Sequence, residues 1–174
     1  MLLTAVFALS LSSFTFEVIL TRTFSISQWN HLSFMVISIA LFGFAASGTL
    51  LSILEARKSA WPRRLFYGDT AAVIITLYTL STIGSFIVLN RIPLDYLKLP
   101  IEPVQAFYLL TAYLLLALPF FFTGLTICIS YTHHVEKTGL IYFASMAGSA
   151  IGAVLPAALL PVLGEENIIL LVFN

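Results

Sequence analysis

Long runs of residues without charge restrict the folds that this sequence can form. No Asp, Glu, Lys or Arg occurs within residues 32–54, 70–90, 103–132 or 138–164. Each run supplies the roughly 20 apolar residues that a helix needs to cross about 30 Å of hydrocarbon. A membrane-spanning strand needs only about 10 residues and alternates in polarity, which these runs do not. The sequence therefore predicts an all-α, polytopic transmembrane helix bundle.

The composition agrees with this class. Charged residues make up 9% of the chain, whereas soluble domains carry roughly a quarter. Eight basic residues balance eight acidic ones, so the chain has no bulk attraction to nucleic acid. We expect the lipid bilayer as its partner and no nucleic acid. The single cysteine, Cys128, excludes an internal disulfide.

The apolar runs predict helices over about 2–20, 32–54, 71–89, 104–130 and 139–163. These would be five complete spans, followed by the start of a sixth near Asn167. Too few apolar residues follow Glu166 to complete that sixth span. We therefore interpret residues 1–174 as a single transmembrane domain that forms the N-terminal part of a longer chain.

Basic residues predict the orientation of these helices. The connection at 55–70 contains Arg57, Lys58, Arg63 and Arg64, and basic loops remain on the cytoplasmic side. The N-terminus is then cytoplasmic as well. With Lys137, this orientation places five basic residues inside, against Arg22, Arg91 and Lys98 outside.

An acid, a base and an imidazole gather around the first predicted hairpin. Glu17 and Arg22 lie near the outer end of the first helix, and Asn30 and His31 at the outer start of the second. A carboxylate near hydrocarbon costs a few kcal/mol on insertion scales, and pairing relieves that cost. One interpretation is a polar clamp that holds the hairpin. The other is a proton or cation pathway through Glu17 and His31.

Small residues predict where helices approach each other closely. Ala144, Gly148 and Gly152 recur every four positions in the fifth helix, and Gly43 and Ser47 do so in the second. Such stripes allow close contact between backbones. We expect packing within the chain, with a homo-oligomer face as the alternative.

Prolines lie inside two of the predicted helices. Pro119 and Pro156 each lack an amide hydrogen and clash with the carbonyl four residues earlier, which is that of Leu115 for Pro119. We therefore predict a kink at each position. Kinked helices also border binding sites in transporters.

Catalytic signatures are absent from the sequence. It contains no G-x-S-x-G, phosphate loop, H-E-x-x-H or C-x-x-C motif. The adjacent His133 and His134 have the wrong spacing for two metal ligands on one helix face. We expect no catalytic residue, no metal and no cofactor in this segment.

Two stretches resemble a known family. "TFEVILTRTFSISQWNHLSFMVISIALFGFAASGTLLS" is similar to the start of bacterial membrane-integrated spermidine synthase-like proteins, whose first helix ends in Tyr-Glu-x-x-x-Thr-Arg. Phe16 replaces the Tyr, while Glu17, Thr21 and Arg22 match. The second stretch matches that family's Pro-Phe-Phe-x-x-Gly run and a later glycine-rich helix at Pro119, Phe120, Phe121, Gly124, Gly139, Tyr142, Gly148 and Gly152. It departs where Ser145 or Met146 replaces an acidic residue.

The resemblance implies a module in the bacterial inner membrane, followed or accompanied by a cytoplasmic synthase domain. That domain would carry the catalytic residues, so whether the whole protein is an enzyme stays open here. The module itself would anchor the synthase or handle a small solute. Two alternatives remain: the first half of a self-contained secondary transporter, or a structural membrane subunit without activity.

Overall fold

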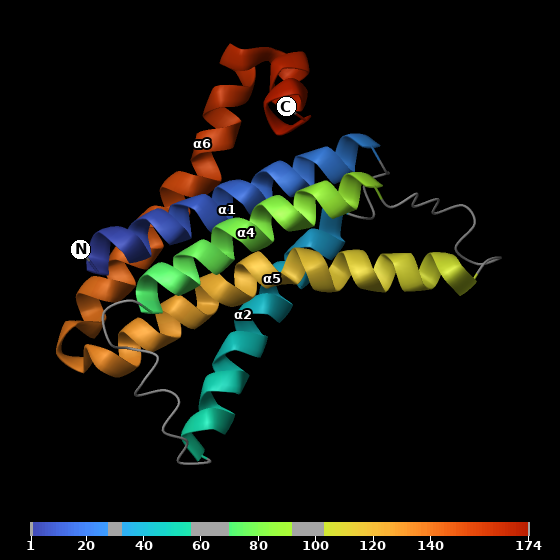
Figure 1. Ribbon diagram of the computed structural model, residues 1–174. Helices are drawn as coiled ribbons and strands as arrows, with labels where there is room; N and C mark the ends of the chain where they lie inside the picture. The colour runs from blue at the N-terminus through green and yellow to red at the C-terminus, as the bar shows by residue number, and fades with distance from the viewer. Residues whose placement is uncertain (1, 28–32, 57–69, 92–102, 174) are drawn as a thin grey trace. The chain divides into compact units, whose positions relative to one another are not determined.

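A computed structural model describes residues 2–27, 33–56, 70–91 and 103–173. These residues form helices and no strand, which confirms the predicted all-α fold. The elements are α1 (Leu2–Ser27), α2 (Ser33–Ala56), α4 (Thr70–Arg91), α5 (Pro103–His133), the 3-10 turn η3 (Val135–Lys137) and α6 (Thr138–Phe173) (Figure 1). The basic segment 57–69 and the residues Asn30, His31 and Lys98 lie outside the described residues.

The chain divides into two compact units. The first comprises Met1–Ile37 and Ser130–Asn174, and therefore contains α1, η3 and α6. The second comprises Ser38–Ile129, with most of α2, all of α4 and most of α5. The prediction of a single transmembrane domain concerns the whole chain and stays a prediction.

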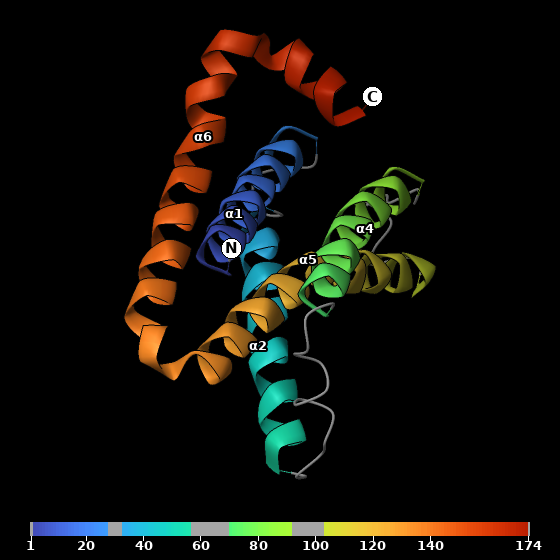
Figure 2. The same cartoon turned by 60° about the vertical axis from the view of Figure 1, so that its left-hand side comes forward.

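In the first unit, α1 and α6 lie side by side (Figures 1 and 2). A Cβ atom on Gly148 would collide with the backbone carbonyl oxygen of Phe7, and one on Gly152 with that of Leu11. Because glycine has no side chain, the two backbones reach contact distance at both positions. The hydroxyl oxygens of Ser10 and Ser145 lie 3.1 Å apart across the same contact.

In the second unit, α2 packs against α5. A Cβ atom on Gly43 would lie 2.7 Å from the carbonyl oxygen of Ala117, so the close approach depends on glycine here too. α4 joins these two helices through a buried cluster to which each helix contributes one residue. That cluster consists of Leu51, Ile74 and Ile129.

Four helices of the described chain are long and apolar enough to cross a membrane. They are Leu2–Ser25, Phe34–Ala56, Pro103–His133 and Val135–Ala158. In α4 the apolar stretch among the described side chains is shorter, Val73–Ser85. The predicted count of five complete spans plus the start of a sixth is therefore not supported. Four apolar helices are compatible with an integral membrane protein.

The predicted sixth helix is not a separate element. α6 runs from Thr138 to Phe173 and includes Asn167, where we expected a new helix to begin. Its 36 residues amount to about 54 Å of helix, and the ribbon bends toward its C-terminal end (Figure 2). The prediction failed because Glu165 and Glu166 end an apolar run without ending a helix, which is held by backbone hydrogen bonds.

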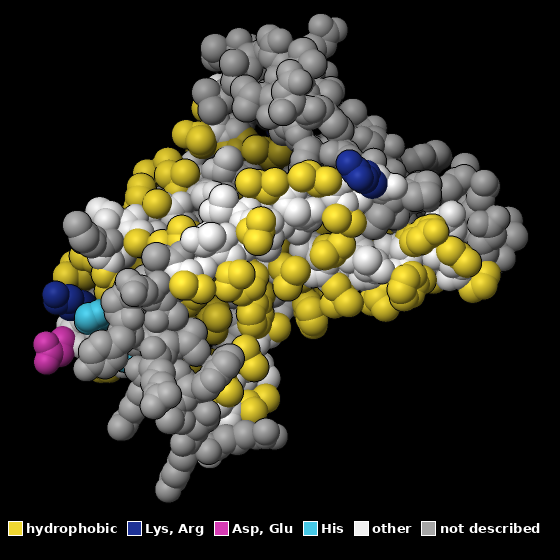
Figure 3. Space-filling view, in the orientation of Figure 1, with side chains coloured by type: hydrophobic (Ala, Val, Ile, Leu, Met, Phe, Trp, Pro, Cys, Tyr) yellow, Lys and Arg dark blue, Asp and Glu magenta, His cyan; other side chains and the backbone are white. Residues whose placement is uncertain are grey.

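Apolar side chains cover much of the described surface on the face shown in Figure 3. Phe34, Phe107 and Phe143 are each at least two-thirds exposed. Such extended apolar exposure is unusual for a soluble domain and typical of helices that face lipid.

The contact between α1 and α6 predicts that two Gly→Ala changes in α6 affect the stability of the protein differently. Gly148→Ala should destabilise the protein by about 1–3 kcal/mol, because the new methyl group meets backbone atoms that cannot move aside. Gly139→Ala is the matched control, since nothing lies within 4 Å of its added Cβ, and it should be neutral or stabilise by up to about 1 kcal/mol. Thermal unfolding in detergent measures both. Equal stability of the two variants would contradict the observed contact.

Candidate functional site

One face of α1 carries a line of polar side chains. Ser10, Ser13, Glu17 and Thr21 lie within about 80° of one another around the helix axis, at 100° per residue. Ser10 and Ser13 are buried, while Glu17 and Thr21 are half-buried. The Thr21 hydroxyl donates a hydrogen bond to the carbonyl oxygen of Glu17 (2.8 Å). This line, which we call the α1 polar face, is the candidate site.

Glu17 lies deeper in the apolar helix than the sequence suggested. We expected the first helix to end near residue 20, with Glu17 one turn from its end. In the structure α1 continues to Ser27, and its apolar span ends at Ser25. Glu17 is therefore eight residues, or about 12 Å, from that end of the span. The backbone continues as helix past Arg22 because a charged side chain does not break the hydrogen bonds of the main chain.

The described residues do not show Glu17 in contact with any of its predicted partners. Arg22 is exposed and lies about 140° from Glu17 around the helix. Within the described part of the chain no ion pair joins the two. Asn30 and His31 lie outside the described residues. The clamp and the pathway therefore both remain hypotheses, and the carboxyl of Glu17 lies half-buried in the middle part of α1.

Ser13 differs from the other buried hydroxyl residues of the described helices. Hydroxyls in apolar helices commonly donate to a carbonyl three or four residues earlier, as those of Thr23 and Thr123 do at 2.9 and 3.0 Å. The side chain of Ser13 is 1% exposed, yet its oxygen has no hydrogen-bond partner among the described residues. A buried polar group without a partner costs about 1–3 kcal/mol, so its presence requires an explanation.

Pro119 lies inside α5 and frees a carbonyl there. Proline has no amide hydrogen, so the carbonyl oxygen of Leu115 receives no helical hydrogen bond from position 119. The hydroxyl of Ser85, on α4, donates to that oxygen at 2.6 Å. A neighbouring helix therefore supplies the hydrogen bond that the proline removes.

Pro156 repeats this arrangement in the other unit. Its missing amide frees the carbonyl oxygen of Gly152, four residues earlier in α6. The hydroxyl of Thr15, on α1, donates to that oxygen at 3.1 Å. Pro119 and Pro156 are thus each paired with a hydroxyl on an adjacent helix of the same unit.

The predicted small residues occupy two different contacts. Ala144 is buried in α6, on the helix whose Gly148 and Gly152 approach α1. Ser47 is fully buried in α2, and its hydroxyl donates to the carbonyl oxygen of Phe44 at 2.7 Å. A Cβ atom on Gly124 of α5 would meet that hydroxyl. These residues lie where helices approach each other closely, and none of them has an ionisable side chain.

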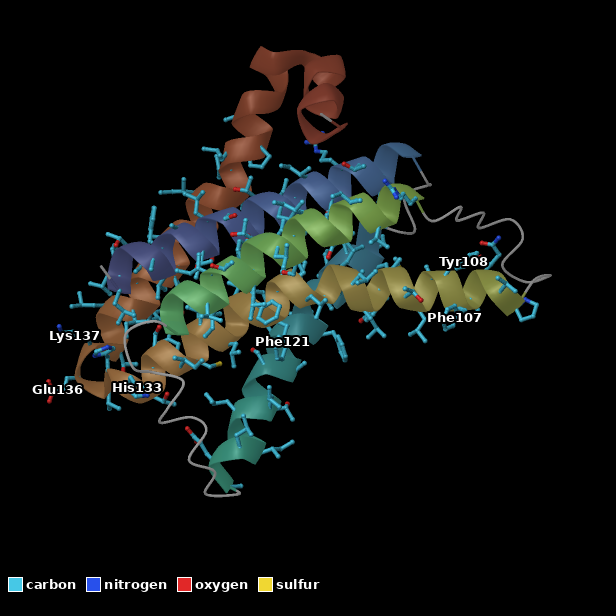
Figure 4. All side chains as sticks on the ribbon, viewed as in Figure 1. Phe107, Tyr108, Phe121, His133, Glu136 and Lys137 are labelled. Atoms are coloured by element: carbon cyan, nitrogen blue, oxygen red, sulfur yellow. The ribbon has the colours of Figure 1, made fainter. Side chains whose placement is uncertain are left out.

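An apolar groove of about 210 Å³ lies between α2 and α5 in the second unit. It is lined by Phe42, Gly43, Ala46, Leu114, Leu115, Ala117, Leu118 and Phe121, of which Phe121 is labelled in Figure 4. None of these side chains is polar. The groove therefore offers a surface for apolar groups and no catalytic chemistry.

The turn between α5 and α6 carries the charged and imidazole side chains labelled His133, Glu136 and Lys137 in Figure 4. All three are exposed. Among the described residues there is no group of three or more His, Cys, Asp or Glu side chains that would hold a metal ion. This turn is therefore a polar end to the two apolar helices.

Sequence reasoning missed the residues that act through hydroxyl groups. Ser13, Thr15 and Ser85 carry no recognisable motif, and their roles depend on which helix lies beside them. The available signal was indirect, because a proline inside an apolar helix implies a hydrogen-bond donor elsewhere. The sequence alone does not say which of the many serines and threonines provides it.

Comparison of the chain with protein-family models, with curated proteins and with solved structures finds no match. The functional interpretation therefore depends on the residues of this chain and on their arrangement.

The hydrogen bond from Ser85 to the carbonyl oxygen of Leu115 predicts that Ser85→Ala destabilises the protein only when Pro119 is present. In the native background the change leaves a carbonyl oxygen without a donor and should cost about 1–3 kcal/mol of folding free energy. In a Pro119→Ala background the restored amide satisfies Leu115, so the same change should cost less than about 0.5 kcal/mol. A double-mutant cycle of unfolding free energies measures the difference. Additive effects would mean that the hydroxyl does not compensate for the proline.

Proposed function

We propose that this chain is the integral membrane module of a spermidine synthase-like protein, and that the module handles a small solute in addition to anchoring the protein. The observation that carries the proposal is the depth of Glu17. It is half-buried and lies about 5 Å from the middle of the apolar span of α1. Ionisable residues at such depth are costly and are functional candidates by default. Anchoring alone does not require a carboxyl group there.

The sequence stretches that resemble the family support the identity of the module. Glu17, which carries the functional argument, is among the positions that match. On this proposal the partners are the lipid bilayer, a fused or associated cytoplasmic synthase domain and, as an alternative, a second copy of the chain. The chemistry of the synthase would be located in that cytoplasmic domain.

We propose the bacterial inner membrane as the location, with the N-terminus in the cytoplasm. The four basic residues at 57, 58, 63 and 64 support this orientation. We also propose that α4 crosses the membrane as a fifth span. Its 22 residues extend over about 33 Å, enough for the hydrocarbon core.

The turn after α5 tests whether α4 crosses. With five spans the residues near Arg63 and Glu136 both face the cytoplasm, whereas with four spans Glu136 faces outward. We expect Glu136→Cys, in a Cys128→Ser background, to be modified by a membrane-impermeant thiol reagent only after the inner face is made accessible. A matched Arg63→Cys variant reports the inner face itself. Labelling of Glu136→Cys from outside, with Arg63→Cys protected, would rule out the fifth span.

The transporter alternative has one observation in its favour. Pro119 lies in the middle of α5 and leaves a backbone carbonyl bonded by a side chain of another helix. α5 is continuous through Pro119, and secondary transporters place substrate sites beside helices that proline or glycine interrupts. The continuing coding sequence discriminates between the alternatives. A strand, a Gly-rich turn and a helix favour the synthase module, six further spans favour the transporter, and a stop codon favours a structural subunit.

Solute handling predicts that Glu17 is required for uptake. In membrane vesicles that contain the full-length protein, Glu17→Gln should lower the uptake of a labelled polyamine by at least about tenfold, equivalent to about 1.4 kcal/mol. Glu136→Gln is the matched control, because it removes an exposed carboxylate in the polar turn η3 between α5 and α6, and it should leave uptake unchanged. Equal uptake by all three proteins, or none by any, would leave the module as an anchor.

A further inference from the structure

We infer that Ser13 and Glu17 together bind a monovalent cation in the middle of α1. This inference rests on the proposed function and names the chemical class of ligand that the α1 polar face recognises. Two observations meet at this position: a buried hydroxyl without a hydrogen-bond partner among the described residues, and a carboxyl group one helical turn away.

The helix places the two oxygen-bearing side chains next to each other. Ser13 and Glu17 are four residues apart, so their Cβ atoms are separated by about 5–6 Å on one face. Side chains on a helix lean toward its N-terminus, which carries the Glu17 carboxyl toward the turn of Ser13. A serine hydroxyl has two acceptor lone pairs and a carboxylate has about four. The pair is therefore a set of oxygen ligands for one small ion.

The depth of the pair favours a ligand over a structural explanation. Ser13 is eleven residues from Leu2 and twelve from Ser25, so it marks the middle of the span. A hydroxyl at that depth has no bulk water to bond. Its neighbours show how such groups are normally satisfied, since Ser10 lies 3.1 Å from the Ser145 hydroxyl and Thr15 donates to Gly152. Ser13 lies between these two residues in the sequence, and its hydroxyl makes neither kind of hydrogen bond within the described structure.

The charge of the site selects a monovalent cation. Glu17 is the acidic residue of this span, and a carboxylate in apolar surroundings is stabilised when one opposite charge neutralises it. A divalent ion would leave a net charge in the same surroundings. Arg22 is exposed and three residues from the end of the span, so its guanidinium can reach the interface instead. An alkali ion and an alkylammonium group share the chemistry that this pair recognises.

Thermal unfolding of the full chain in detergent tests the inference. The salts are the chlorides of sodium, potassium, methylammonium and choline at constant ionic strength, and choline is the reference because it has no N–H and is bulky. We expect at least one of the first three to raise the melting temperature relative to choline, with a saturable dependence on concentration. The identity of the stabilising salt separates an alkali ion from an alkylammonium group.

Two variants and two controls localise the effect. Ser13→Ala should raise the half-saturating concentration about three- to tenfold, as expected for the loss of one hydroxyl ligand, and Glu17→Gln should abolish the stabilisation. Ser12→Ala and Glu136→Gln, both of exposed residues, should match the native protein. If Glu17→Gln does not fold, the Ser13→Ala titration decides the question on its own.

The inference is wrong if no salt stabilises the native protein beyond choline, or if Ser13→Ala titrates as the native protein does. Its failure is distinguishable from failure of the proposed function, because binding is measured here without uptake. Uptake that depends on Glu17 without any cation-specific stabilisation would overturn the cation site and leave the solute-handling role standing. Cation binding without uptake would leave the cation site standing and overturn the solute-handling role.

Discussion

The structure depends on one constraint, which is that polar backbone groups of an apolar helix need hydrogen-bond partners from protein. Pro119 and Pro156 each violate this requirement inside a helix by removing an amide donor. In both cases a hydroxyl from an adjacent helix bonds the freed carbonyl, Ser85 to Leu115 and Thr15 to Gly152. A water-exposed helix would leave the same task to solvent. Through these two prolines α5 and α6 are each joined to a neighbouring helix by a side-chain hydrogen bond.

Close approach of the backbones makes these hydroxyl bonds geometrically accessible. Serine and threonine side chains are short, so they reach a carbonyl on another helix only where the two helices nearly touch. Gly152 contributes in two ways. It has no Cβ atom to keep Leu11 at a distance, and its own carbonyl oxygen accepts the hydrogen bond from Thr15. Small residues and hydroxyl residues therefore act together in the contact between α1 and α6.

On the α1 polar face one polar group lacks the hydrogen-bond partner that such groups need in an apolar helix. Along one helix the chain satisfies the hydroxyls of Ser10, Thr15 and Thr21, and it leaves that of Ser13 without a partner among the described residues. Glu17 follows one turn later, in the same apolar span. A hydroxyl and a carboxyl at this depth are costly unless a ligand completes them, which is the physical basis for assigning a role to this face.

The sequence by itself determined that the chain is all helical, because apolar runs of about 20 residues leave few other ways to bond the backbone. It also located the prolines and the carbonyl of Leu115 that Pro119 frees. The length of α1, the continuity of α6 and the depth of Glu17 were decided only by the tertiary structure, since a charge interrupts an apolar pattern without interrupting a helix. The partners of Leu115 and Gly152 were likewise undetermined, because the hydroxyls that bond them are about 30 and 137 residues away in sequence and meet them only when the helices pack.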